Sequence, residues 1–182
     1  GFTASVAYEG QGNSTKGFST KESTDAIGAQ LAYTGDTFGA SVSWANIENH
    51  DATNAVTTGN GDGQTQSIGF NAYYAPDLSN FPSISAGFET NHNDSVEGTS
   101  NDQTSHYFIG IQWDEVFDGT LGAALGSKEP YAEDSDANTM YEVFYSYDYA
   151  DGITITPLIY SKDNSGSTAD ETGVIVKSTF SF

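Results

Sequence analysis

The chain lacks cysteine and arginine, and no part of it is a long apolar run. Without cysteine, neither disulfides nor thiol chemistry can contribute to the fold or to function. No stretch approaches the roughly 20 apolar residues that a membrane-spanning helix requires. These absences exclude helical membrane proteins, but they leave open the class that crosses a membrane with strands of about 9–11 residues.

The charge of the chain is strongly unbalanced. Twenty-five Asp and Glu residues oppose five Lys residues, for a net charge of −20. A protein that binds nucleic acid neutralises phosphates with clustered cations, and this chain has few of them. Nucleic acid is therefore excluded as a partner. The length of 182 residues fits one domain, and we treat residues 1–182 as a single unit.

Apolar and polar residues alternate with a period of two along ten segments. Uncharged, mainly apolar side chains occupy every second position, whereas no stripe with the helical period of 3.6 persists. The ten alternating sets run over Phe2–Tyr8, Ile27–Tyr33, Phe38–Trp44, Ile68–Tyr74, Ile84–Phe88, Tyr107–Trp113, Leu121–Leu125, Tyr141–Tyr149, Ile153–Ile159 and Val174–Phe182. The pattern predicts an all-β protein with about ten antiparallel strands.

Short links and long acidic loops take turns between these segments. The short links are Thr34–Asp36, Pro76–Pro82, Asp114–Asp118 and Ala150–Gly152. The longest loop, Asn46–Gln64, could fold inward as a constriction. Outer-membrane barrels have this asymmetry, with short periplasmic turns and long outer loops. We therefore predict an antiparallel transmembrane β-barrel.

The two faces of the predicted strands distinguish a membrane protein from a soluble one. The second face carries small or hydrophilic side chains, as a water-filled lumen allows. A soluble β-sandwich, for example an acidic adhesin, also has one apolar and one polar face. Aromatic residues toward the strand ends favour the barrel, because barrels carry aromatic girdles at both membrane interfaces. The predicted interface residues are Tyr8, Tyr33, Trp44, Tyr74, Trp113, Tyr149 and Phe182.

The last segment, "TGVIVKSTFSF", places Val174, Val176, Phe180 and Phe182 on one face and ends in Phe. It resembles the C-terminal assembly signal of outer-membrane barrels. The stretch from Asp151 to Phe182 more narrowly resembles the end of cyanobacterial porins related to the carbohydrate-selective porin family. That resemblance implies a passive diffusion channel in the outer membrane of a Gram-negative or cyanobacterial cell. It also implies lipid and the barrel-assembly machinery as partners, and commonly a homotrimer.

Such porins generally have more than ten strands, so we expect this chain to be the C-terminal part of a longer barrel. If ten strands closed alone, the lumen would be narrow, because barrel width grows with strand number. In that case, inward-facing aromatic residues would fill much of it. These residues are Tyr73, Phe108, Phe144 and Tyr160.

Carboxylates on the predicted inner face suggest a selectivity for cations. Glu9, Glu89, Glu142 and Asp148 face the lumen, and Lys177 is the inward cation that opposes them. Rings of carboxylates favour cations and repel anions. We expect a channel for ions and small hydrophilic solutes that prefers cations.

An outer-membrane hydrolase is the alternative from another class of protein. His92 and His106 are predicted at adjoining strand ends near Glu89, Asp94 and Asp102, as a catalytic rim site requires. No nucleophile stands out, so we predict no catalytic residue and no enzymatic activity. We also predict no cofactor and no dedicated metal site.

Adventitious Ca²⁺ in the acidic loops remains compatible with the sequence. Asp134, Asp136 and Asn138 have the early oxygen spacing of a calcium loop. The Gly of the sharp turn and the Glu at the twelfth position are both missing.

Overall fold

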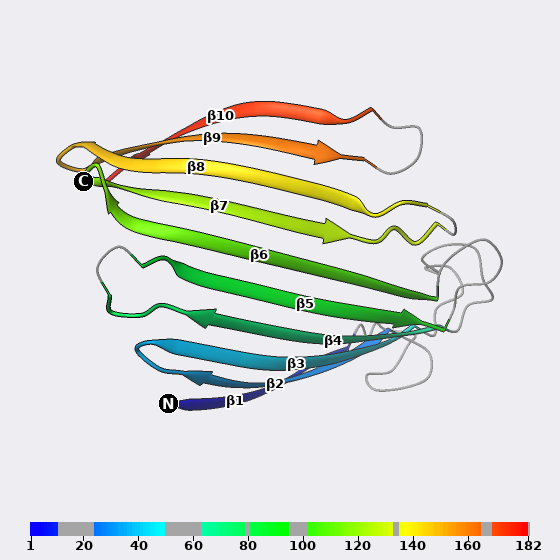
Figure 1. Cartoon of the computed structure of the whole chain (residues 1–182). Helices are drawn as coiled ribbons and strands as arrows, with labels where there is room; N and C mark the ends of the chain where they lie inside the picture. The colour runs from blue at the N-terminus through cyan, green and yellow to red at the C-terminus, as the bar shows by residue number, and fades with distance from the viewer. Residues whose placement is uncertain are drawn as a thin grey trace.

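A computed structural model describes residues 1–10, 24–49, 63–78, 81–94, 102–132, 135–164 and 169–181. These residues form one antiparallel sheet of ten strands in chain order, so each strand pairs with its neighbour in the sequence (Figure 1). The strands are β1 Phe2–Gly10, β2 Asp25–Thr34, β3 Phe38–Asn49, β4 Gly63–Tyr74, β5 Ser83–Asn93, β6 Gln103–Val116, β7 Gly119–Lys128, β8 Asn138–Ala150, β9 Ile153–Asp163 and β10 Glu171–Phe180. The predicted all-β fold and strand number are confirmed.

Alternating β-branched, aromatic and small residues form these strands because such side chains pack well on a pleated surface. The four short turns lie at one end of the sheet, as the sequence predicted, and β1 begins and β10 ends at the same end (Figure 1). Within the described ranges, no helix is long and apolar enough to cross a membrane.

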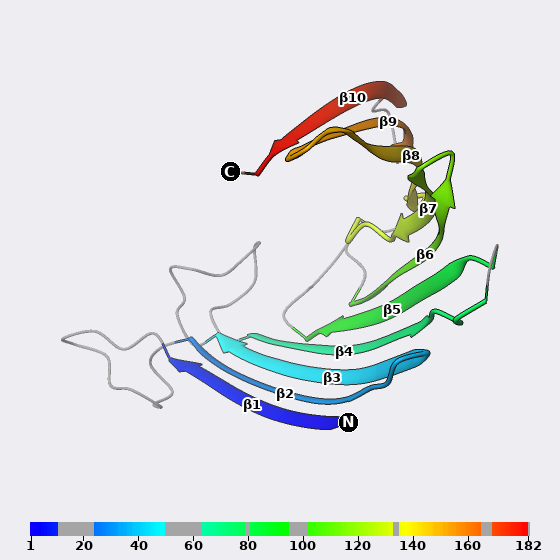
Figure 2. The same cartoon turned by 90° about the vertical axis from the view of Figure 1, so that its left-hand side faces the viewer.

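The sheet curves into a trough whose two edges remain apart (Figure 2). β1 pairs with β2 alone, and β10 pairs with β9 alone, so the sheet is not closed. Each edge strand therefore presents a row of backbone N–H and C=O groups that lacks a ladder partner within the described residues. Such an edge is a template for pairing with another strand.

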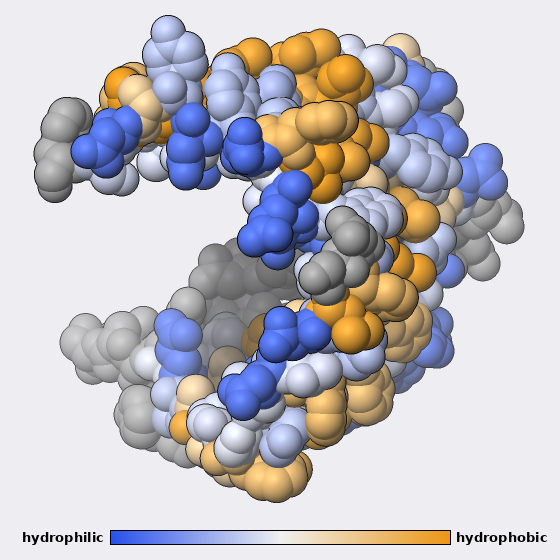
Figure 3. All heavy atoms as spheres, turned by 60° about the vertical axis from the view of Figure 1, so that its left-hand side comes forward, coloured by the Kyte–Doolittle hydropathy of each residue, from blue (hydrophilic) through white to orange (hydrophobic). Residues whose placement is uncertain are grey.

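The convex surface of the trough is apolar, whereas the concave surface is mainly polar (Figure 3). No hydrophobic side chain among the described residues is buried, and Val6 and Val174 remain 75% and 68% exposed. A soluble sandwich would bury its apolar face against a second sheet. The described residues contain one sheet and no second layer, so the sandwich hypothesis lacks the packing that it requires.

The turn between β6 and β7 is the most irregular of the short links. The pairing register shifts between Trp113 and Val116, and Glu115, Phe117 and Asp118 have φ angles of 59°, 49° and 62°. A residue with a side chain loses roughly 1 kcal/mol or more of conformational free energy when its backbone adopts these left-handed angles. The hydroxyl of Tyr145 donates to the carbonyl oxygens of Val116 at 2.9 Å and Phe117 at 2.7 Å, which holds the turn in this shape.

Candidate channel lining on the concave face

Strand register places the predicted inner side chains on the concave face together. In one row across the sheet, Ser43 lies opposite Gly69, Gly69 opposite Glu89, and Glu89 opposite His106. The row continues to Lys128 on β7. Residues two apart in a strand share a face, so this row and its neighbours carry the small and hydrophilic residues expected of a lumen.

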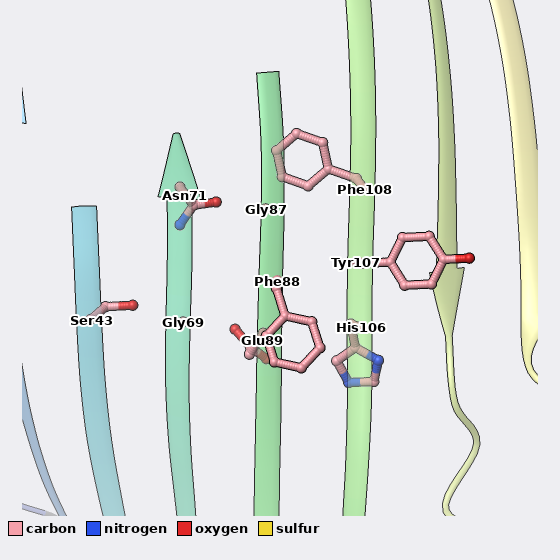
Figure 4. A pocket seen from close by; sticks show the side chains of 9 residues that line it. All are labelled: Ser43, Gly69, Asn71, Gly87, Phe88, Glu89, His106, Tyr107 and Phe108. Atoms are coloured by element: carbon pink, nitrogen blue, oxygen red, sulfur yellow. The ribbon is translucent and has the colours of Figure 1, made fainter. Parts of the chain in front are cut away.

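A hollow of about 260 Å³ lies over β3 to β6 at this row (Figure 4). We call it the Glu89 hollow. Its lining includes Ser43, Asn71, Glu89, His106 and Phe108. The carboxylate of Glu89 therefore faces the polar side chains of Ser43, Asn71 and His106 and an aromatic ring. Among the described residues, no Lys lines the hollow.

Hydrogen bonds hold the carboxylate of Glu89 in place. Asn91 Nδ2 donates to Glu89 Oε1 at 3.0 Å, and the hydroxyl of Ser67 donates to Asn91 Oδ1. Asn91 is buried, with 8% of its surface exposed. The network fixes one oxygen of Glu89 and leaves the other, Oε2, directed over Gly69.

Gly69 and Gly87 form the floor of the hollow, because neither carries a side chain. A Cβ built on Gly69 would lie 2.7 Å from Ser43 Oγ and 4.0 Å from Glu89 Oε2. A Cβ on Gly87 would lie 2.6 Å from Asn71 Oδ1 and 2.3 Å from the Phe108 ring. The three side-chain oxygens and the ring therefore gather around two glycines on adjacent strands.

The inward aromatic rings lie across the wall and not toward the middle of the trough. Each ring covers the glycine directly opposite on the neighbouring strand, where a Cβ would lie within 2.3 to 2.6 Å of it. The pairs are Tyr73 over Gly39, Phe108 over Gly87, Phe144 over Gly122, and Tyr160 over Gly173. In the open trough these rings lie against the backbone, because the absent glycine side chains leave room for them. The expectation that they fill a lumen applied to ten strands that close alone, and this sheet is not closed.

The other predicted selectivity residues are spread over the sheet. Glu9 lies on β1 and Lys177 on β10, at opposite edges, while Glu142 and Asp148 lie on β8. Lys177 stands opposite Thr156 and not opposite a carboxylate, and Asp148 accepts a hydrogen bond from the Thr154 hydroxyl at 2.7 Å. The trough brings no two of the five predicted residues into a cross-strand pair.

Sequence reasoning missed Asn91 and Ser67 as supports of Glu89. Asn91 could have been found, because it stands two positions after Glu89 and therefore shares its face. Ser67 could be identified only from the pairing register between β4 and β5, which places it opposite Asn91.

The two histidines of the hydrolase hypothesis lie on opposite faces of the sheet. His106 is opposite Glu89 on the concave face, whereas His92 is opposite Gln103, three positions from Glu89 and thus on the convex face. His92 Nε2 lies 2.6 Å from Asp94 Oδ1. The structure therefore does not join the two histidines into one site.

Aromatic residues on the convex face form belts near both ends of the strands. Tyr8 and Trp44 lie toward the loop end, and Tyr107 and Tyr141 join them there. Toward the turn end, rings contact one another at centroid distances of 5.0 Å (Phe2–Tyr33 and Tyr33–Phe38) and 6.5 Å (Tyr74–Phe81). Trp113 and Tyr149, which the sequence also predicted as interface residues, lie near the turn ends of β6 and β8.

Beyond the loop-end belt, the convex face becomes polar. Gln64 Nε2 donates to Asn46 Oδ1 at 2.7 Å, and Asn46 Nδ2 donates to Glu48 Oε1 at 3.2 Å. Near the same rim, the hydroxyl and the N–H of Ser105 donate to Glu129 Oε2 at 2.7 and 2.6 Å. These two bonds, the hydroxyl bond above all, lower the pKa of the Glu129 carboxyl.

Some predicted features lie outside the described residues. These are Phe182, Asp134 and residues 50–62 of the longest loop. The other residues of the predicted assembly signal, Val174, Val176 and Phe180, lie exposed on β10. Among the residues that the structure describes, no group of three His, Asp or Glu side chains is arranged to hold a metal ion.

No family model matches the chain, and no curated protein or solved structure does so either.

Proposed function

We propose that this chain forms part of the wall of an outer-membrane porin, a passive channel for ions and small hydrophilic solutes that prefers cations. The convex surface faces lipid in this proposal, and the concave surface lines the water-filled path. No residue acts as a catalyst. The resemblance of the C-terminal segment to cyanobacterial porins supports the location in an outer membrane, assembly by the barrel machinery and a homotrimer.

The uncovered apolar convex face is the observation that carries the proposal. A soluble protein rarely exposes a contiguous apolar surface larger than a few hundred Å². Here apolar side chains cover the convex side of a ten-stranded sheet, and none among the described residues is buried. Hydrocarbon is the environment in which such a face is stable.

The height of the apolar band is close to that of a membrane. On β1, β3 and β6 the band covers seven residues, from one aromatic residue to another six positions along: Phe2–Tyr8, Phe38–Trp44 and Tyr107–Trp113. Seven residues span roughly 20 Å of strand, and transmembrane barrels have an apolar band of about 25 Å. The polar rim beyond Trp44 marks where the band ends.

The two free edges require partners in a bilayer, because unpaired backbone groups are unstable in hydrocarbon. We propose that β1 and β10 pair with further strands of a longer barrel. The concave carboxylates then line part of a wider lumen, and their excess over the lysines of the same face attracts cations.

Conductance in a planar lipid bilayer tests this function. The complete barrel that contains this chain should, when purified, produce steps of current that persist without an energy source. In a salt gradient, the reversal potential should have the sign of cation preference, and Glu89→Gln should move it toward zero. Absence of conductance from protein that has inserted into the bilayer would overturn the proposal, and an anion-selective reversal potential would overturn the cation preference.

A further inference from the structure

The Glu89 hollow presents three oxygen acceptors around one opening. Glu89 Oε2 and Ser43 Oγ converge over Gly69, while Asn71 Oδ1 lies over the adjacent Gly87 (Figure 4). Glu89 Oε1 is already occupied by Asn91, so its second oxygen is the one turned to the opening. A ligand that fits must donate several hydrogen bonds and compensate one negative charge.

The ring of Phe108 borders the same opening. It is 43% exposed and lies against Gly87, so one face of the ring is turned to the trough. The face of an aromatic ring attracts cations and contacts the methylene groups of a short alkyl chain. The charged and the apolar part of one small molecule therefore both have a partner in this hollow.

From these contacts we infer that the Glu89 hollow binds a small organic cation that carries a primary ammonium group. The ammonium group has three N–H donors, which match Glu89 Oε2, Ser43 Oγ and Asn71 Oδ1. Its short alkyl chain lies on Phe108. This inference rests on the proposed function, since it names the solute class that the channel wall recognises.

The lining favours this solute over the other charged classes. An anion would meet Glu89, and no Lys of the described part of the chain lines the hollow to balance that carboxylate. A transition-metal ion would lack its usual ligands, because no group of three His, Cys, Asp or Glu side chains occurs in the described part of the chain. The glycine floor also limits the site to this stretch of wall, since any side chain at Gly69 or Gly87 would collide with the groups that form it.

Block of the potassium current through the full chain in planar bilayers tests the inference. Ethylammonium should block the current at a concentration roughly tenfold lower than tetramethylammonium, which has the same charge but no N–H donors. Ethanol, which is similar in size and uncharged, should not block. Glu89→Gln should weaken the ethylammonium block by roughly tenfold, and Ser43→Ala by roughly threefold.

Glu142→Gln is the matched control, because it removes the same charge from the same face of another strand. It should leave the concentration for half-block by ethylammonium within about twofold of the unaltered protein, since a remote charge is screened by salt. An equal effect of Glu142→Gln and Glu89→Gln would overturn the site, because the block would then depend on the general field. Equal block by ethylammonium and tetramethylammonium would overturn it too.

A binding measurement separates this inference from the proposed function. Calorimetric titration of the detergent-solubilised protein with ethylammonium should show binding that Glu89→Gln weakens, whether or not the protein conducts. Binding without conductance would contradict the channel and keep the site. Conductance without ethylammonium binding would keep the channel and contradict the site.

Discussion

The convex and concave faces of the trough are made by the same ten strands, yet different forces determine their side chains. On the convex face, apolar residues of many shapes occur, and in the proposed channel the only requirement there is compatibility with lipid. On the concave face, residue identity depends on the neighbour across the strand, as Phe108 over Gly87 shows. The residue types on the convex face therefore depend on the surroundings of the protein, and those on the concave face depend on the pairing register of the strands.

A charge placed on the convex face should have the largest effect. We expect Val42→Arg, in the middle of β3, to destabilise the protein in a bilayer by about 2–4 kcal/mol, as Arg does near the midplane of a membrane. Ser41→Arg, its neighbour on the concave face, should cost less than about 1 kcal/mol, because its charge remains in water. Urea unfolding in lipid vesicles measures both. Equal costs for the two variants would contradict the assignment of the faces.

A methyl group at a ring-covered glycine should have the next largest effect. In Gly87→Ala the new Cβ would lie 2.3 Å from the Phe108 ring, so the ring must move. We expect a loss of about 1–3 kcal/mol in the same unfolding assay, as for other overpacked sites. Gly126, on the other side of β6, is the control, because the nearest atom to its Cβ would be 3.4 Å away.

Gly126→Ala should therefore change the stability by less than about 0.5 kcal/mol. Phe108→Ala combined with Gly87→Ala should recover part of the loss, because the collision is removed. A double variant as unstable as the sum of the single variants would show that the ring and the glycine do not interact.

Removal of one hydroxyl at the turn end should have a smaller effect. Tyr145→Phe removes the donor to the carbonyl oxygens of Val116 and Phe117, and we expect a loss of about 1 kcal/mol. Tyr147→Phe is the control, since the Tyr147 ring stacks on Tyr145 at a centroid distance of 5.8 Å without holding the turn. Unfolding together with the rate of proteolysis at the turn compares the two. A turn cleaved equally fast in both variants would argue against the clamp.

The smallest effect is expected at the polar rim of the convex face. Ser105→Ala should raise the pKa of Glu129 toward its ordinary value, because the hydroxyl that stabilises the carboxylate is lost. A lowered pKa in the folded state stabilises the protein above the unfolded value and loses this contribution as the pH falls through the folded value. Carboxyl NMR titration in micelles measures the shift. An unchanged titration of Glu129 would contradict the role of Ser105.

The fold was largely predictable, because a period of two predicts both where the strands lie and which face of the sheet each side chain is on. The ten alternating sets each fall within a strand, apart from Phe182, which lies outside the described residues. The irregular turn at Glu115, Phe117 and Asp118 was not predictable, since none of these residues is a glycine.

The candidate site was predictable only in part. Glu89 and its face followed from alternation, but its partners depend on which residues of β3, β4 and β6 lie opposite, and hydrophobic patterning leaves that register open by steps of two. The separation of His92 from Glu89 was available from the sequence, because three positions along a strand reverse the face. The contacts between aromatic rings and the glycines opposite them could be predicted only from the complete set of strand pairings.

The order of the strands has a consequence for how this wall can change. Every strand pairs only with its neighbours in the chain, so removal or duplication of one hairpin leaves all other hairpins intact. Because the diameter of a barrel increases with strand number, the proposed channel could change its bore in increments of two strands. The Glu89 hollow, confined to β3 through β6, would persist unaltered through any such increment made elsewhere in the sheet.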